Sequence, residues 1–170
     1  MIIIRSECHE DWAAIHAVTE SAFRNKAYAA GDEQDLIDIL RSIDSLTFSL
    51  VAVDNGEVIG QITFSPATIS SGSHPWYALG PVSVLPARQG EGIGAQLIEE
   101  GLLQLQTLGA LGCILTGNPA YYSRFGFDFS PQNVPDNELE KYFMLKQFKG
   151  ERPIGVFSFH PAFYGGVKIE

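Results

Sequence analysis

Apolar positions recur with helical spacing in three segments and in short continuous or β-branched runs elsewhere. Apolar residues three to four positions apart predict helices over 11–23, 33–43 and 92–108. A shorter helix is predicted over 119–125, with a proline at its first position. The apolar runs predict strands over 1–5, 47–53, 58–64, 76–85, 111–116, 127–129 and 154–159. Residues 136–149 have a mixed pattern that favours no element.

Two turns within this pattern carry topological information. Asn55-Gly56 lies between two apolar runs, which is a strong signal for a β-hairpin. Gly80-Pro81 interrupts the strand over 76–85, and because proline cannot donate to a ladder, a bulge or a local parting of strands is expected there. The strand–helix–strand succession over 76–116 predicts a right-handed crossover between parallel strands. Together these elements predict an α/β fold in one domain, residues 1–170.

Composition and charge narrow the classes of function. The chain has 170 residues, 45% of them hydrophobic, which is enough for a substantial core. Its formal net charge of −9 argues against nucleic-acid binding, which needs clustered Lys and Arg. No apolar run approaches the ~18 residues of a membrane span. The start of the chain lacks the features of a signal peptide, so the cytoplasm is the expected location.

Metal binding through cysteine is not indicated. Cys8 and Cys113 form neither a CxxC pair nor a zinc set, and Cys113 is expected to be a buried apolar residue. No group of His, Asp and Glu shows the spacing of metal ligands, so no metal is expected.

A glycine-rich loop between strand 76–85 and helix 92–108 predicts an anion site. The loop contains Gly90, Gly92 and Gly94, which leave the backbone amides uncovered. The first amides of the following helix have no partner within the helix, and its dipole adds partial positive charge. Such a site suits a phosphate or pyrophosphate. Arg88 is either a solvated charge or a further phosphate contact.

Three kinds of phosphate loop can be compared with this segment. A P-loop requires a Lys-Ser or Lys-Thr pair that is absent here. Gly90-x-Gly92-x-x-Ala95 fits a loose dinucleotide fingerprint, but the strand does not lead into it directly and the expected acidic residue ~20 positions on is missing. The third candidate, Gln89-x-x-Gly92-x-Gly94, resembles the acetyl-CoA loop of the GNAT N-acetyltransferase superfamily.

A second motif strengthens this resemblance. Tyr122-x-x-x-Gly126-Phe127 is similar to a Tyr-x-x-x-Gly-Phe segment found beyond the fifth strand in GNAT proteins. The two motifs in this order resemble the YhbS-like branch of the superfamily. The resemblance implies a GNAT-type mixed, mostly antiparallel central sheet that is splayed at a bulged fourth strand. Helices are expected on both of its faces.

The resemblance also implies roles for individual residues. Pantetheine would lie along the main chain of Val82, Ser83 and Val84. The pyrophosphate would lie on the loop formed by Arg88, Gln89, Gly90, Glu91, Gly92, Ile93 and Gly94. Asn118 and Phe125 would contact the cofactor from beyond the fifth strand. Tyr122 would give a proton to the departing CoA thiolate.

The general base is the least defined part of this expectation. Many GNAT proteins carry a glutamate on the fourth strand, and none occurs here over 76–85. Glu33 is the candidate, with Asp32 and Asp35 beside it, since the second helix borders the acceptor side in the family. Glu33 has an equally simple interpretation as a helix-capping residue. His74 is either a base or a turn residue.

The sequence therefore leads to an acetyl-CoA-dependent N-acetyltransferase acting on a primary amine of a small molecule or protein. Loops near 24–35 and 130–150 are expected to form the acceptor side. A non-catalytic acyl-CoA-binding protein of the same fold is the alternative, motivated by the missing strand glutamate. A nucleotide enzyme is a third hypothesis. The oligomeric state stays open, a homodimer included.

Overall fold

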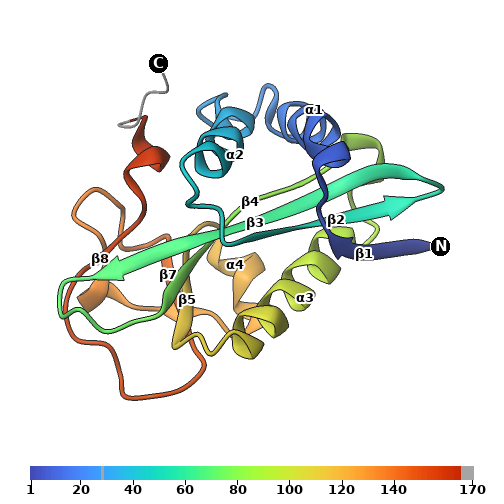
Figure 1. The fold of residues 1–170 in the computed structure, drawn as a ribbon. Helices are drawn as coiled ribbons and strands as arrows, with labels where there is room; N and C mark the ends of the chain where they lie inside the picture. Colours follow the sequence, from blue (N-terminus) through green and yellow to red (C-terminus); the bar gives the residue numbers. More distant parts are fainter. Residues whose placement is uncertain (28, 166–170) are drawn as a thin grey trace. The chain divides into compact units, whose positions relative to one another are not determined.

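A computed structural model describes residues 1–27 and 29–165 of the chain (Figure 1). Tyr28, which falls within the expected acceptor loop, and residues 166–170 lie outside the described part. The chain divides into two compact units. Unit 1 comprises residues 1–65, 80–101 and the segment from 161, and unit 2 comprises residues 66–79 and 102–160. The strands follow the order β1-β2-β3-β4-β5-β7-β6, with β8 paired to β3.

Unit 1 is built on an antiparallel meander. Its strands are β1 (Ile2–Ser6), β2 (Phe48–Asp54) and the first part of β3 (Glu57–Ile69). The turn between β2 and β3 has positive φ at Asn55 (51°) and Gly56 (78°), as an Asn-Gly hairpin requires. The hairpin predicted from the sequence is thus confirmed.

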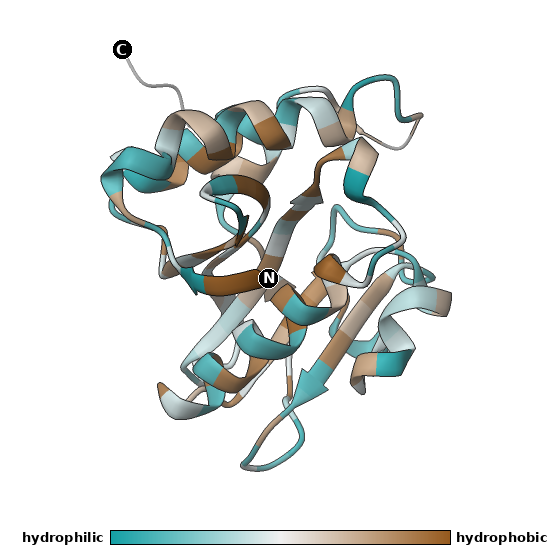
Figure 2. Cartoon of the chain, turned by 90° about the vertical axis from the view of Figure 1, so that its right-hand side faces the viewer, coloured by the Kyte–Doolittle hydropathy of each residue, from teal (hydrophilic) through white to brown (hydrophobic). Residues whose placement is uncertain are grey.

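Helices cover both faces of this meander. On one face, α1 (Trp12–Phe23) and α2 (Glu33–Ser42) bury Ile15 and Ile37 against Val51 of β2. On the other face, α3 (Ile93–Thr107) begins beside Gly60 of β3, where a β-carbon would lie 3.2 Å from a Leu97 methyl group. The helices alternate hydrophilic and hydrophobic residues along their length (Figure 2). The apolar face expected for α3 is buried throughout: Ile93, Leu97, Ile98, Leu102 and Leu105.

Unit 2 contains the parallel part of the sheet. The first residues of β4 (Trp76–Val84) run parallel to β5 (Gly112–Thr116), and β7 (Phe143–Gln147) is antiparallel to β5. The short β6 (Asp128–Phe129) pairs with β7, and β8 (Phe157–Ser158) pairs with the end of β3. The rings of Trp76 and Phe143 both contact that of Phe157, with centroids 4.9 and 6.0 Å away.

The ladder between β4 and β5 ends early. Its register runs from Trp76↔Gly112 to Ala78↔Ile114, and within the described residues it goes no further. The next residues of β4 are Leu79, then Gly80 with φ of 135° and Pro81 after a cis peptide bond. The parallel pairing and its interruption at this dipeptide are as the sequence predicted.

Several boundaries differ from those predicted. β3 continues to Ile69 rather than ending at residue 64, because its last residues find a partner in β8, which no local pattern reveals. β7 lies in the segment that favoured no element, and β8 is only two residues long. The helix predicted over 119–125 splits into α4 (Pro119–Tyr122) and a 3-10 turn (Ser123–Phe125). None of the helices described here has the length and apolar character to cross a membrane.

Candidate functional site

The glycine loop leaves β4 through a 3-10 turn (Pro86–Arg88) and reaches α3 at Ile93. Gly90 and Gly92 have φ of +84° and +82°, a left-handed conformation that glycine adopts without strain. A β-carbon at either position would meet no atom within 4 Å. The loop therefore presents bare backbone to open space.

The start of α3 adds donors to this surface. The Gln96 amide donates to the Gly92 carbonyl at 3.1 Å, which is the first turn of the helix. The amides of Ile93, Gly94 and Ala95 precede this bond, so helix geometry gives them no acceptor inside α3. Three N–H groups at the positive end of a 15-residue helix form a site for an anion.

Arg88 is held by two carboxylates of unit 1. Its Nη2 lies 3.0 Å from Asp54 Oδ2, and its Nε lies 2.9 Å from Glu91 Oε2. The hydrogen bonds to Glu91 and Asp54 raise the pKa of Arg88, and the bond to Arg88 lowers the pKa of Asp54. Arg88 is thus not a freely solvated charge: it fastens the loop to the end of the β2–β3 hairpin.

The end of β4 next to the loop has an edge that, among the described residues, pairs with no strand of the β5 ladder. The Leu85 amide donates to the Ile59 carbonyl of β3 at 2.9 Å, so Leu85 turns its main-chain groups toward β3. Because these directions alternate along a strand, Ser83 also faces β3, while Val82 and Val84 face away from it. Gln89 Nε2 donates to the Val84 carbonyl at 3.0 Å. The amides of Val82 and Val84 thus point away from the β3 ladder.

The remaining cofactor and acid candidates belong to unit 2. The Asn118 side chain caps α4, since its Oδ1 accepts from the Ala120 amide at 3.0 Å. Tyr122 is half-buried, with its ring edge-on to those of Tyr121 and Phe127 at centroid distances of 5.1 and 6.1 Å. Phe125 is buried, and its carbonyl accepts from Lys146 Nζ at 2.5 Å. These three candidates therefore lie along one short segment: Asn118 caps α4, Tyr122 ends it, and Phe125 ends the 3-10 turn that follows.

The Glu33 carboxylate is engaged with the backbone before α2. Its oxygens accept from the Ala30 and Gly31 amides at 2.9 and 3.1 Å. This is the capping arrangement that the sequence offered as an alternative to a catalytic role. Each oxygen keeps a second lone pair, so the carboxylate can still accept a proton.

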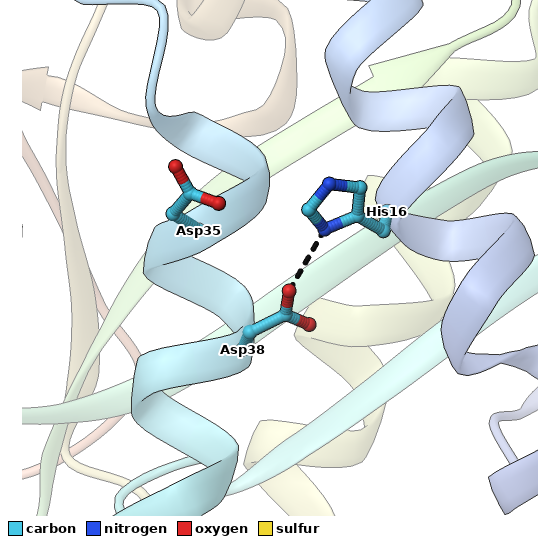
Figure 3. Close-up of side chains that lie close together, drawn as sticks. All are labelled: His16, Asp35 and Asp38. Carbon is cyan, nitrogen blue, oxygen red and sulfur yellow. Dashed lines mark hydrogen bonds and ion pairs between the residues drawn. The ribbon is translucent and has the colours of Figure 1, made fainter. Parts of the chain in front are cut away.

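One cluster of titratable side chains was missed by sequence analysis. His16 of α1 points toward Asp38 of α2, with Nδ1 2.8 Å from Oδ2, and Asp35 lies beside them (Figure 3). Arg41 Nη1 is 3.3 Å from the other oxygen of Asp38, and Arg41 also binds Glu7 at 2.8 Å. The partners are 22 residues apart in sequence, so no local spacing could reveal them. The cluster joins α1 to α2.

A hollow of about 630 Å³ lies in unit 2, away from the Tyr122 end of β5. It is lined by residues such as His74, Trp76, Leu111 and Arg152. Leu111 precedes β5 whereas Tyr122 follows it, and a strand of this length spans roughly 16 Å. The His74 ring lies in this hollow with Nδ1 3.3 Å from the Gly72 carbonyl, as a turn residue would.

Comparison with known proteins identifies the family of this chain. The profile of the acetyltransferase (GNAT) domain matches residues 4–130. The chain is 35% identical to the uncharacterized N-acetyltransferase YhbS of Escherichia coli K12 over 130 residues, 76% of this chain and 75% of that protein.

Two solved structures extend the similarity to nearly the whole chain. A GNAT family acetyltransferase from Brucella melitensis, in complex with acetyl-CoA, is 47% identical with a TM-score of 0.86, covering 96% of this chain and 98% of that one. E. coli YhbS in complex with CoA is 29% identical with a TM-score of 0.88, covering 96% and 92%. The resemblance inferred from the two motifs is confirmed: the chain belongs to the GNAT acetyltransferase family and is similar to its YhbS members.

Proposed function

We propose that this protein moves the acetyl group of acetyl-CoA to a primary amine of a small molecule or protein, by direct transfer in a ternary complex. The observation that carries the proposal is the bare glycine loop that leads into α3, followed by three amides that helix geometry leaves without an acceptor inside α3. Two similar proteins have structures with acetyl-CoA or CoA bound, which supports the same cosubstrate here. No metal is part of this proposal.

The cofactor is proposed to bind in three stretches. The pyrophosphate lies on the amides from Gln89 to Gly94, with Arg88 stabilising the loop. Pantetheine bonds the outward main chain of Val82 and Val84 like an added strand. Asn118 and Phe125 are proposed to contact the cofactor from unit 2. Both units are proposed to form one domain over residues 1–170, which agrees with a family match that crosses both.

The transfer step forms a C–N bond and breaks a C–S bond. A lysine-like amine has a pKa of about 10.4, so its deprotonation at pH 7 costs roughly 4.6 kcal/mol. Glu33 is the proposed base for this proton, directly or through water. The neutral amine attacks the thioester carbon, and the Val84 amide is proposed to stabilise the oxyanion. Tyr122 then protonates the departing thiolate, and the nitrogen, positively charged after the attack, releases its second proton to solvent as the neutral amide forms.

The net charge of the protein fits this assignment. A protein with a formal net charge of −9 attracts cationic amines rather than nucleic acids. Affinity for the anionic cofactor must then come from the local amides of the loop. We propose that the enzyme works in the cytoplasm.

The alternative is an acyl-CoA-binding protein without transfer activity. Two observations favour it: β4 carries no acidic residue, and the Glu33 carboxylate already binds two amides. Such a protein would bind acetyl-CoA but would release no thiol in the presence of amines.

The test combines binding with turnover. In thermal-shift titrations, acetyl-CoA and CoA should raise the melting temperature of the protein and NAD should not. Free-thiol release is then measured with acetyl-CoA and a panel of amines, with acetyl-CoA alone as the blank. Amine-dependent release supports the transferase, and binding without any release across the panel supports the alternative. Stabilisation by NAD but not by acetyl-CoA would overturn both.

A further inference from the structure

A buried chain of polar side chains connects three elements of unit 1 beneath β4. Gln61 of β3 and Thr19 of α1 are fully buried, and Ser83 of β4 is nearly so. Gln61 Nε2 donates to Ser83 Oγ at 2.7 Å and to the Pro81 carbonyl at 3.1 Å. Ser83 Oγ lies 3.0 Å from Thr19 Oγ1. A core strand is an unusual place for a glutamine, so its side chain requires an explanation.

The direction of every hydrogen bond in this chain can be assigned. Thr19 donates its hydroxyl proton to the Ile15 carbonyl of α1 at 2.7 Å. Ser83 must therefore be the donor to Thr19, and it accepts from Gln61 in turn. Gln61 uses both amide hydrogens, and its Oε1 accepts from Thr63 at 2.9 Å. Both polar atoms of the Gln61 amide thus have partners, which fix the side chain from both ends.

The same chain fixes the part of β4 on which the cofactor is proposed to lie. Gln61 binds the main-chain carbonyl of Pro81 and the side chain of Ser83. Pro81 and Ser83 lie on either side of Val82, and Ser83 precedes Val84. β4 leaves its ladder with β5 after Ala78, so on that edge no strand pairing holds residues 80–84 within the described residues. The side-chain amide of Gln61 supplies two hydrogen bonds to this part of β4 from one face of the sheet, where strand pairing with β5 is absent.

We propose that Gln61 is a positioning residue for acetyl-CoA binding, which aligns the main chain of Val82–Val84 through its paired bonds to Pro81 and Ser83. Thr19 extends the same support to α1. This inference rests on the proposed function, since it assumes that the outward edge of β4 receives pantetheine. It makes Gln61, which never touches the cofactor, a determinant of affinity.

The test compares Gln61→Leu with a core variant that removes no hydrogen bond. Gln61→Leu keeps most of the side-chain volume but leaves the Pro81 carbonyl and the Ser83 hydroxyl without their donor. Calorimetric affinity for acetyl-CoA should fall at least tenfold. Amide hydrogen exchange in peptides covering 80–84 should become faster in the free protein. The control, Ile37→Val, loosens the core of the same unit without removing any hydrogen bond of this network and should keep wild-type affinity.

A second pair of variants guards against a folding defect. Thr19→Val removes the bond to Ser83 at constant shape and should weaken acetyl-CoA binding, and Thr19→Ser, which restores the hydroxyl, should recover it. Wild-type affinity in both Gln61→Leu and Thr19→Val would overturn the inference while leaving the proposed function intact, even if hydrogen exchange is faster. If the wild-type protein binds no acetyl-CoA, the proposed function fails, and this inference fails with it.

Discussion

The ring of Tyr122 packs against its neighbours, whereas its hydroxyl is the proposed acid, and a substitution can remove one without the other. Its ring packs edge-on against Tyr121 and Phe127 and lies close to Gly117, where a β-carbon would be 2.6 Å from it. Tyr122→Phe preserves this packing, so the fold should persist. Because only the proposed acid is lost, kcat should fall by about 10²-fold with little change in acetyl-CoA affinity. Steady-state kinetics with an established amine acceptor measures both quantities.

The neighbouring tyrosine provides a matched control for this prediction. Tyr121→Phe removes the same atom from the preceding residue, to which no role is assigned, and should keep the wild-type kcat. Proton transfer from a tyrosine of pKa about 10 to a thiolate of pKa about 8.5 is uphill by roughly 2 kcal/mol, so a modest effect is expected. Normal turnover by Tyr122→Phe would show that this residue serves packing alone.

Asp11 makes the stability of the protein depend on pH. The bond to Arg5, 2.7 Å long, and that to the Cys8 amide lower the pKa of Asp11 from 3.8 to about 2. Its pKa is lower in the folded than in the unfolded chain, so its stabilisation is complete above pH ~5 and is lost as the pH falls toward 2. Asp11→Asn should lower the free energy of unfolding at pH 7 by about 1–2 kcal/mol, less than the full shift because Arg5 is partly exposed.

Urea unfolding at pH 7, 5, 3 and 2 checks this dependence. The difference between wild type and Asp11→Asn should shrink toward zero as the pH approaches 2. Asp136→Asn, which changes an exposed carboxylate, is the control and should show little difference at any pH. A difference that stays constant with pH would mean that the ionised carboxylate is not the source of the stabilisation.

Which residues could be identified from the sequence depends on how far apart their partners lie. The loop glycines and the buried Cys113 were predicted, because backbone freedom and an apolar run are local features. The partners of Arg88 and His16 were not, since Asp54 and Asp38 are 34 and 22 residues away. Gln61 was missed for the same reason: a polar residue in a strand gains meaning only when the strand beside it is known.

Among the elements, α3 packs closely against β3. A β-carbon at Gly101 would lie 2.5 Å from Cζ of Phe64 on β3. Alanine gains about 1 kcal/mol of helix propensity over glycine, but overpacking a rigid ring costs about 1–3 kcal/mol. Gly101→Ala should therefore destabilise the protein by about 1 kcal/mol in chemical denaturation, against the sign that propensity alone would give.

A double mutant isolates the contact behind this prediction. Phe64→Leu removes the ring that meets the new methyl group, so Gly101→Ala should be neutral or stabilising in that background. Gln96→Ala on the exposed side of α3 is the control and should change stability little. If Gly101→Ala stabilises the wild-type protein, α3 is packed less tightly against β3 than the structure indicates.

Elements with a strong local pattern were predicted more accurately than those that depend on pairing. α1, α2 and α3 begin and end within a residue or two of their predicted bounds, since periodicity marks them directly. The end of β3 and the whole of β7 depend on strands that pair with them from distant parts of the chain. Residues such as Pro66 in β3 and Lys146 in β7 interrupt the apolar pattern by which a strand is predicted.

For the whole molecule, two motifs in the right order were enough to predict the fold class. The glycine loop marks the crossover from β4 to β5, and the Tyr-x-x-x-Gly-Phe segment marks the short helix and turn beyond β5. The family match from 4 to 130 spans both motifs. The acceptor could not be predicted, because its expected loops over 24–35 and 130–150 lack any repeating pattern.

The central claim is that the glycine loop binds the pyrophosphate of acetyl-CoA, and calorimetry on Gly92 variants tests it most directly. Gly92→Asp places a negative charge where phosphate should lie, whereas Gly92→Asn adds a side chain of equal size without charge. Both residue types tolerate the left-handed conformation at this position. We predict that acetyl-CoA affinity falls at least tenfold in Gly92→Asp and less in Gly92→Asn, with both proteins folded. Equal, wild-type affinity in all three proteins would contradict the account.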